Sequence, residues 1–301
     1  GFAVDKKVAA QTTGVDVIVG GHSNTLLSNT QERAVDVYPV MVGNTAIVQA
    51  YAYGKFLGER NVSFNDAGEI TQAVGEPVLM DGAVAEDSDT KARITEAAAP
   101  REEIRNHVVA NAASAIEGDR AVCRVLECPM CNLVADAMLA RVKDQGVEVA
   151  IANLGCLRAS IHGGDVTMGE VLTVLPFQNT LSTFRVSGEV LVAALENGVS
   201  QIEEVKGRFP QVAGISFTVD PAAEVGARVS NVMVGGAPID PAKVYGVVSN
   251  NYVRNGGDGY KMFRDASDAY DFGPDLADVT AEYLAEQGPS TPYTDGRITV
   301  K

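Results

Sequence analysis

Short apolar runs separated by turn residues fill the first part of the chain and predict β-strands. Residues 14–19 form the most compact run, which is bounded by glycine and leads into Gly20-Gly21-His22-Ser23-Asn24. Further strands are predicted at residues 35–42, 45–51 and 57–63. A cluster of turn-forming residues at 65–68 predicts a turn, and the strand-rich part is expected to end near Met80.

The pattern changes at residues 86–105. The acidic, Ser-containing start at residues 86–89 is typical of a helix N-terminus, and good helix formers follow from Lys91 to Ala99. Pro100 is expected to interrupt this helix. The sequence therefore predicts a polar linker helix between two domains.

From residue 107 onward, patterns typical of strands alternate with patterns typical of helices. Thr167 and Glu170 have the spacing of a capping box at a helix start. Helices are predicted at residues 132–141, 190–202 and 275–285, and strands at residues 147–152, 214–219, 229–234 and 243–249. The alternation predicts an α/β or α+β domain of about 190 residues.

Composition narrows the class of protein. Hydrophobic residues make up 46% and charged residues 21%, which is typical of a globular chain. The net charge of -15 argues against binding to a nucleic-acid backbone, and no apolar run is long enough to span a membrane. The chain begins without Met and without a signal-peptide pattern, so we interpret Gly1 as a cut end.

Four cysteines lie at positions 123, 128, 131 and 156. Cys128 and Cys131 have zinc-type spacing, but the other two do not complete a second such pair. Disulfides are therefore favoured over a zinc site, and disulfides place a chain outside the cytosol.

Several loops that follow predicted strands or helices carry residues suited to chemistry. Histidine and asparagine on a Gly-rich turn suit a metal ion, Arg suits a phosphate, Asp suits ribose hydroxyls and aromatic rings suit a nucleobase. These residues are His22, Asn24, Asn153, Arg158, Phe177, Tyr252 and Asp258. Taken singly, each also fits an ordinary role as a loop, salt-bridge or core residue.

Six segments resemble the 5′-nucleotidases of the ecto-enzyme and periplasmic UDP-sugar hydrolase type. The resemblance extends over nearly all 301 residues. The segments are Gly-Val-Asp-Val-Ile-Val-Gly-Gly-His-Ser-Asn-Thr (14–25), Val-Gln-Ala-Tyr-Ala-Tyr-Gly-Lys-Phe-Leu-Gly (48–58), Cys-Arg-Val-Leu-Glu-Cys (123–128), Asn-Leu-Val-Ala-Asp-Ala-Met (132–138), Val-Leu-Pro-Phe (174–177) and Asn-Gly-Gly-Asp-Gly-Tyr (255–260).

The resemblance implies a fold and a domain organisation. This family joins a calcineurin-like metallophosphoesterase domain to a nucleoside-binding α/β domain through a helix. Residues 1–85 would be the C-terminal part of the first domain, residues 86–106 the linker helix and residues 107–301 the substrate-binding domain. Hydrolysis of nucleoside 5′-phosphates at a two-metal site is the implied activity.

The resemblance also implies site residues. His22 and Asn24 would each bind one of two divalent ions, with zinc expected first and manganese, cobalt or calcium as alternatives. The implied substrate residues are Arg124, Asn153 and Arg158 for polar groups, with Arg158 near the phosphate, Phe177 and Tyr252 for the base, and Asp258 for the ribose hydroxyls.

The family's catalytic His–Asp pair and its other metal ligands would lie upstream of Gly1, so we expect no catalytic residue within this chain. The chain alone is then expected to be inactive and to need the N-terminal catalytic segment as a partner. The other expected partner is the nucleotide or nucleoside substrate. Neither nucleic-acid binding nor a membrane span is expected, and a homodimer is left as an alternative to a monomer. The alternatives are a non-catalytic nucleotide-binding module and an esterase acting on a UDP-sugar, a cyclic nucleotide or a thiosulfonate. A periplasmic or extracellular location is expected.

Two cysteines depart from the family pattern. Cys156 replaces a Gly in the Asn153–Arg158 loop, and Cys131 replaces the Gly that usually precedes Asn132. Family members often pair cysteines at the neighbouring positions of helix and strand. The resemblance therefore predicts two disulfides, Cys123–Cys128 and Cys131–Cys156.

Overall fold

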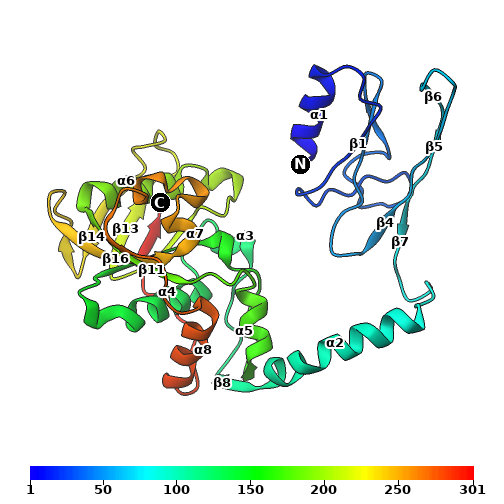
Figure 1. Ribbon diagram of the computed structural model, residues 1–301. Helices are drawn as coiled ribbons and strands as arrows, with labels where there is room; N and C mark the ends of the chain where they lie inside the picture. The colour runs from blue at the N-terminus through cyan, green and yellow to red at the C-terminus, as the bar shows by residue number, and fades with distance from the viewer. The chain divides into compact units, whose positions relative to one another are not determined.

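The computed structural model describes residues 1–301, which form two compact units, Gly1–Thr95 and Glu96–Lys301 (Figure 1). The division falls inside helix α2, Ser88–Asn106. No helix in the structure is both long enough and apolar enough to cross a membrane.

The first unit contains a three-stranded sheet. The predicted strands at 14–19 and 45–51 are confirmed, and they pair in parallel through β1 and β3, whereas β2 pairs with β3 in antiparallel fashion. The helix and strands are α1 (Phe2–Gln11), β1 (Val17–Val19), β2 (Val40–Val42) and β3 (Thr45–Val48). Phe2, Tyr38 and Ile47 belong to a small core between α1 and this sheet.

Two predicted strands of the first unit differ in extent. Only the end of the predicted strand 35–42 becomes β2, because Pro39 has no N–H to donate to a ladder. The predicted strand 57–63 is divided between two antiparallel strand pairs. Their strands are β4 (Phe56–Gly58) with β7 (Pro77–Leu79), and β5 (Asn61–Phe64) with β6 (Ile70–Val74), the latter pair joined by the predicted turn.

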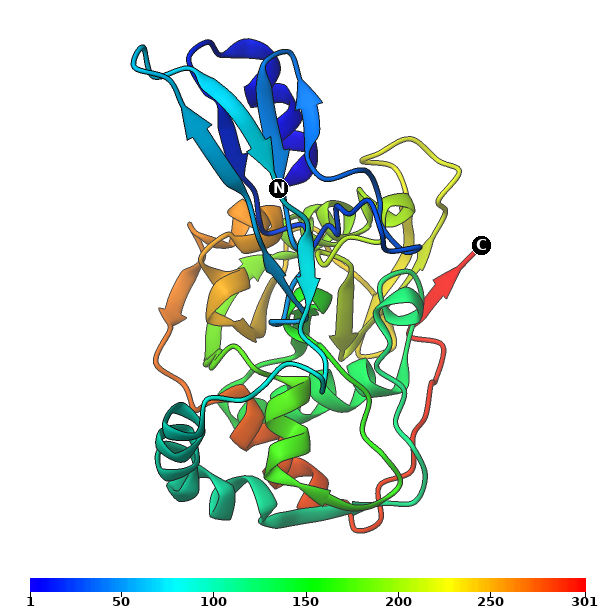
Figure 2. The same ribbon diagram turned by 90° about the vertical axis from the view of Figure 1, so that its right-hand side faces the viewer.

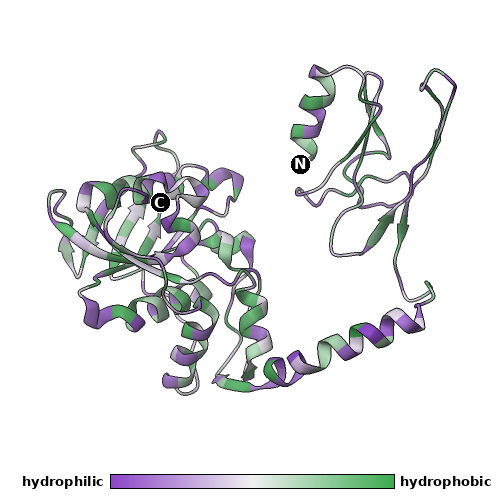
Figure 3. Cartoon of the chain, viewed as in Figure 1, coloured by the Kyte–Doolittle hydropathy of each residue, from purple (hydrophilic) through white to green (hydrophobic).

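Helix α2 continues through Pro100, so the predicted interruption is wrong. A proline inside a helix leaves a carbonyl group without its partner. No residue of α2 is buried, and hydrophilic residues dominate its surface in Figure 3, so water can satisfy that carbonyl group.

The second unit is built on a five-stranded mixed sheet of order β12-β9-β16-β11-β17. Strands β9 and β16 are parallel neighbours, and the other pairs are antiparallel. The strands are β9 (Val149–Asn153), β11 (Leu181–Ser187), β12 (Pro210–Ala213), β16 (Val244–Asn250) and β17 (Ser267–Tyr270). The predicted strands at 147–152 and 243–249 are thus confirmed.

A second, four-stranded sheet of order β15-β14-β13-β18 continues from the first at Gly214. This glycine has φ +74°, and a Cβ there would lie 2.0 Å from the carbonyl oxygen of Glu148, so only glycine allows the bend between β12 and β13. The strands are β13 (Ile215–Val219), β14 (Val229–Val234), β15 (Ala237–Pro238) and β18 (Ile298–Val300).

Helices cover both faces of the five-stranded sheet. In Figures 1 and 2, α4 and α8 lie on one side of it and α6 and α7 on the other. A two-stranded pair, β8 with β10, completes the unit. The remaining elements are β8 (Val108–Ala112), α3 (Arg120–Cys123), α4 (Pro129–Val142), β10 (Gly164–Thr167), α5 (Met168–Val174), α6 (Gly188–Val199), α7 (Asn251–Arg254) and α8 (Leu276–Glu286).

The predicted helix starts are confirmed in part. Thr167 and Glu170 form both hydrogen bonds of the predicted capping box at the start of α5. Helix α4 begins at Pro129, earlier than predicted, because proline is favoured in the first turn of a helix. The predicted class, a mixed α/β fold, is confirmed.

Candidate functional site

The parallel strands β9 and β16 bring their carboxyl ends to one edge of the sheet, where Asn153 and Asn250 end the strands. The segment that follows β16 carries Tyr252, in the short helix α7, and Asp258, in the turn after that helix. Asn153 Nδ2 donates a hydrogen bond to Asp258 Oδ2 at 2.6 Å, and Tyr252 Oη donates to Asp258 Oδ1 at 3.1 Å. Three predicted site residues therefore meet in one hydrogen-bonded cluster.

Glycine makes this cluster possible. A Cβ at Gly155 would lie 2.6 Å from Asn153 Nδ2 and 3.0 Å from Asp258 Oδ2, so a side chain there would separate the two groups. A Cβ at Gly257 would lie 2.4 Å from the Tyr252 ring, so the bare glycine lets that ring pack against the loop. Asp258 itself has φ +49°, a strained backbone conformation of the kind found at binding sites.

The charges of Arg120, Arg158 and Asp258 all act on the guanidinium of Arg124. Burial lowers the pKa of Arg124, and repulsion from Arg120 and Arg158 adds to this effect, whereas Asp258 opposes it. The Arg124 guanidinium also donates to the carbonyl oxygen of Val205 at 3.1 Å. This part of the site therefore carries concentrated positive charge despite the acidic net charge of the chain, which favours an anion.

Phe177 and Tyr252 present aromatic rings on the same unit. Phe177 follows α5, and its side chain is 49% exposed, as is that of Tyr252. The Arg158 guanidinium lies 4.6 Å from the centroid of the Phe177 ring. Because both residues are about half exposed, their rings can accept a flat heteroaromatic partner.

His22 and Asn24 lie in the first unit, on the turn after β1. Both are exposed, and both have positive φ, at 66° and 52°. Ser23 ties the turn in place, because it accepts from the backbone N–H of Phe2 at 3.0 Å and bonds Gln49. An imidazole nitrogen and an amide oxygen suit a divalent ion, so the donor chemistry of this turn fits a metal.

Two donors do not complete such a site. The only group of three or more His, Cys, Asp or Glu ligand atoms close enough to hold an ion consists of Cys123, Cys128 and Cys131. Cys123 and Cys128 are bonded to each other, which leaves one thiol in that group. His22 and Asn24 would therefore need further ligands, which the three cysteines do not supply.

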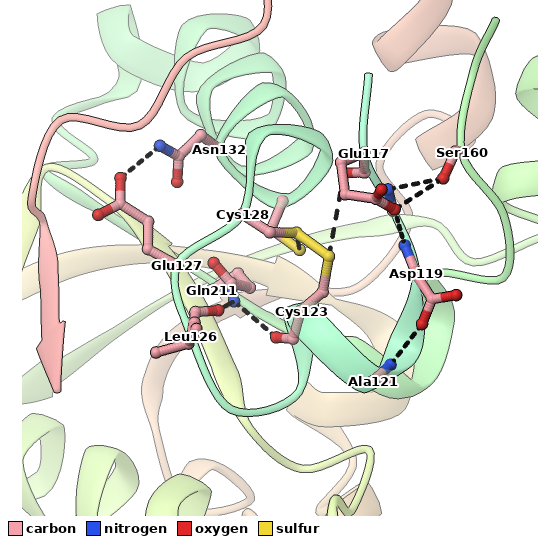
Figure 4. The surroundings of a disulfide bond; sticks show 12 residues. Glu117, Asp119, Ala121, Cys123, Leu126, Glu127, Cys128, Asn132, Ser160 and Gln211 are labelled. Atoms are coloured by element: carbon pink, nitrogen blue, oxygen red, sulfur yellow. Dashed lines mark hydrogen bonds between the residues drawn. A yellow bond between two sulfur atoms is a disulfide. The ribbon is translucent and has the colours of Figure 1, made fainter. Parts of the chain in front are cut away.

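The predicted bond between Cys123 and Cys128 is present, with a Cα–Cα distance of 5.2 Å (Figure 4). Gln211 Nε2 donates at 3.0 Å to the carbonyl oxygens of Cys123 and Leu126 and so fastens the loop within the bond. Asp119 accepts from the N–H of Ala121 and caps the short helix that ends at Cys123.

The predicted bond between Cys131 and Cys156 is not formed, and both are buried free thiols. Helix α4 begins early, so Cys128 and Cys131 share its first turn, and Cys131 Sγ lies 2.7 Å from Cys128 Sγ. Cys156 Sγ instead donates to the carbonyl oxygen of Asn153 at 2.9 Å. Burial raises the pKa of Cys156 to about 12, so this thiol keeps its proton.

Three polar residues at the cluster were not predicted. Asn250 is fully buried and donates to Asn153 Oδ1 at 3.0 Å. Asn197 Nδ2 donates to the carbonyl oxygen of Asp258 at 3.2 Å, and the Arg208 guanidinium donates to Asn197 Oδ1. The available signal for Asn250 was its place at a strand end, like that of Asn153.

A groove of about 660 Å³ lies elsewhere in the second unit. It is lined by residues of α2, β8, α5 and α8, among them Ile104, Val108 and Met168. It contains none of the predicted site residues, so cavity size does not identify the site in this chain.

Comparisons with known proteins identify the family of the chain. The family described as "5'-nucleotidase, C-terminal domain" matches residues 108–265. The chain is 35% identical to the trifunctional nucleotide phosphoesterase YfkN of Bacillus subtilis over 98% of this chain and 20% of that protein. It is 31% identical to the snake venom 5'-nucleotidase of Macrovipera lebetinus over 99% of this chain and 80% of the relative.

A solved structure gives the same result. The crystal structure of a 5'-nucleotidase precursor from Thermus thermophilus matches with a TM-score of 0.81 and 38% identity, covering 100% of this chain and 62% of that one. The chain spans about half the length of several other curated relatives. Since the family match covers more than half of the residues, the chain belongs to the 5'-nucleotidase family.

Proposed function

We propose that this chain carries the nucleoside-binding domain of an enzyme that hydrolyses nucleoside 5′-phosphates. Residues 107–301 would bind the substrate, residues 86–106 would link the two parts, and residues 1–85 would belong to a metallophosphoesterase domain. The observation that carries the proposal is the cluster of Asn153, Tyr252 and Asp258 at the sheet edge, with Arg124 near enough for its charge to interact with that of Asp258.

Each group of this cluster suits one part of a nucleotide. The carboxyl group of Asp258 accepts hydrogen bonds, so it would receive the ribose hydroxyls. Phe177 and Tyr252 would stack on the base. Arg124 and Arg158 would bind the anionic end, because a guanidinium donates two parallel hydrogen bonds to a phosphate.

His22 and Asn24 would hold one divalent ion each, with zinc expected first. Such ions supply an activated water and neutralise charge on the transferring phosphoryl group. The role of residues 107–301 in this reaction would be to bind and orient the substrate. Effective orientation lowers a barrier by making the encounter of reacting groups intramolecular.

The location is part of the same proposal. The Cys123–Cys128 bond is typical of proteins that fold outside the cytosol. Snake venom 5'-nucleotidases are among the relatives. A periplasmic or extracellular enzyme is therefore proposed.

Calorimetry on the 301-residue chain tests the binding role. We expect adenosine to bind with or without added Zn²⁺, because the nucleoside residues lie on one unit and need no metal. AMP hydrolysis by this chain alone is expected to stay at background with Zn²⁺ or Mn²⁺, because two ligands do not complete a metal site. Absence of adenosine binding at millimolar concentration would contradict the proposal.

An activity assay with an added N-terminal segment separates the proposed enzyme from the non-catalytic alternative. A nucleotide-binding module would bind adenosine and would stay inactive even when the matching N-terminal segment of a relative is supplied. The proposed enzyme would regain metal-dependent AMP hydrolysis in that mixture.

A further inference from the structure

Two buried asparagines lie side by side at the ends of the parallel strands β9 and β16. Asn250 is fully buried and Asn153 is 2% exposed. Buried amides must find hydrogen-bond partners, and an amide has a donor side and an acceptor side. The orientation of each amide therefore depends on which partner it meets.

A backbone group fixes the first orientation. Asn250 caps helix α7, and its Oδ1 accepts from the N–H of Val253 at 2.9 Å. A backbone N–H can only donate, so Asn250 must direct its oxygen to Val253 and its Nδ2 to the other side.

The second orientation follows from the first. Asn250 Nδ2 donates to Asn153 Oδ1 at 3.0 Å, so Asn153 must direct its own Nδ2 away, to Asp258 Oδ2 at 2.6 Å. If Asn250 were absent, Asn153 Oδ1 would lose its buried donor, and only the bond to Asp258 would hold the amide. The Asn153 side chain would then be free to shift away from the position in which it meets Asp258.

These hydrogen bonds form a relay that runs from Val253 through Asn250 and Asn153 to Asp258. The Asp258 carboxylate at its end can still accept further hydrogen bonds. Asp258 receives Asn153 Nδ2 on one oxygen and Tyr252 Oη on the other, and each carboxylate oxygen has a second acceptor position. Burial and the Asp258 charge raise the pKa of Tyr252, so its hydroxyl keeps the proton that it donates.

We propose that Asn250 is a positioning residue that fixes the Asn153 amide and thereby keeps Asp258 available to accept from vicinal hydroxyls of the sugar. The proposal rests on the nucleoside site described above. Its consequence is selectivity: a ribonucleoside offers the 2′- and 3′-hydroxyls as donors, whereas a 2′,3′-dideoxyribonucleoside lacks both. A site built to bond a hydroxyl rejects the analogue that lacks it.

Substitutions at position 250 separate this role from helix capping. Asn250→Ser retains a hydroxyl that can cap α7 but is too short to reach Asn153, whereas Asn250→Ala removes both contacts. Ser249→Ala is the matched control, because this neighbouring buried hydroxyl bonds the carbonyl oxygen of Ile151 at 2.6 Å, outside the relay.

Calorimetry would compare adenosine with 2′,3′-dideoxyadenosine. The unaltered chain should prefer adenosine by roughly tenfold or more, as expected for charge-assisted hydrogen bonds. Asn250→Ser and Asn250→Ala should both reduce that preference to about threefold or less, while Ser249→Ala retains it. An unchanged preference in Asn250→Ser would overturn the relay.

A second measurement does not depend on nucleoside binding. In the free protein, the side-chain amide protons of Asn153 should exchange slowly with solvent, and Asn250→Ser should accelerate this exchange at least about tenfold. Equal exchange rates would overturn the relay. Faster exchange together with absent adenosine binding in the unaltered chain would retain the relay and refute the proposed function instead.

Discussion

Replacing Phe177 by Ala tests the aromatic part of the proposed site most directly. Stacking of a base on an aromatic side chain contributes about 1–3 kcal/mol. In the free protein, the Arg158 guanidinium already lies 4.6 Å from the ring centroid. A contact of this kind is worth about 0.5–1 kcal/mol at an exposed site, and a base that took the same face would have to displace it.

The net loss in Phe177→Ala is therefore expected to be about 1–2 kcal/mol, which weakens adenosine binding roughly 5- to 30-fold. Calorimetry of both proteins with adenosine measures this difference. Phe64→Ala is a suitable control, because Phe64 is 55% exposed against 49% for Phe177 and lies in the first unit. A change of less than about twofold, with unaltered melting temperature, would refute the stacking argument.

Three further predictions concern stability. The double variant Cys123→Ser/Cys128→Ser opens the loop that the disulfide closes, which has a sequence separation of 5. The unfolded chain thereby gains conformational entropy, which should lower the free energy of unfolding by about 2 kcal/mol and the melting temperature by roughly 4–8 °C. An unchanged melting curve would contradict this prediction. Gly214→Ala should cost at least about 2 kcal/mol in urea unfolding, because the alanine would have a positive φ and a Cβ against a carbonyl oxygen, and a neutral result would exclude that reasoning. Arg297→Met removes the guanidinium that lies 2.8 Å from the Asp136 carboxylate, and should lower the free energy of unfolding by about 3 kcal/mol. Adding Asp136→Leu to that variant should restore part of the loss, and full stability of Arg297→Met alone would disprove this role.

The sequence was sufficient for strands and helices with a clear period and an unambiguous start. The capping box at Thr167 and the strand ending at Asn153 are examples. It was not sufficient at Pro100, because an exposed helix tolerates a proline that a buried one would not. The helix start at Pro129 was also missed, and with it the position of Cys131 against the neighbouring bond.

The candidate site was predicted residue by residue but not as an assembly. Asn153, Tyr252 and Asp258 were named from their loops, and their hydrogen bonds depend on β16 lying beside β9. That adjacency is a long-range property of the sheet, which local periodicity does not contain. Asn250 was missed for the same reason, because its partner Asn153 is distant in sequence.

The bend at Gly214 has a consequence for how the second unit unfolds. Strands β12 and β13 are one continuous stretch of chain, so a single backbone segment supplies hydrogen bonds to both sheets. Neither sheet can lose that segment without exposing the other. Hydrogen exchange should therefore report the two sheets as one cooperative unit with a common opening free energy, and a chain break at this glycine would abolish that cooperativity.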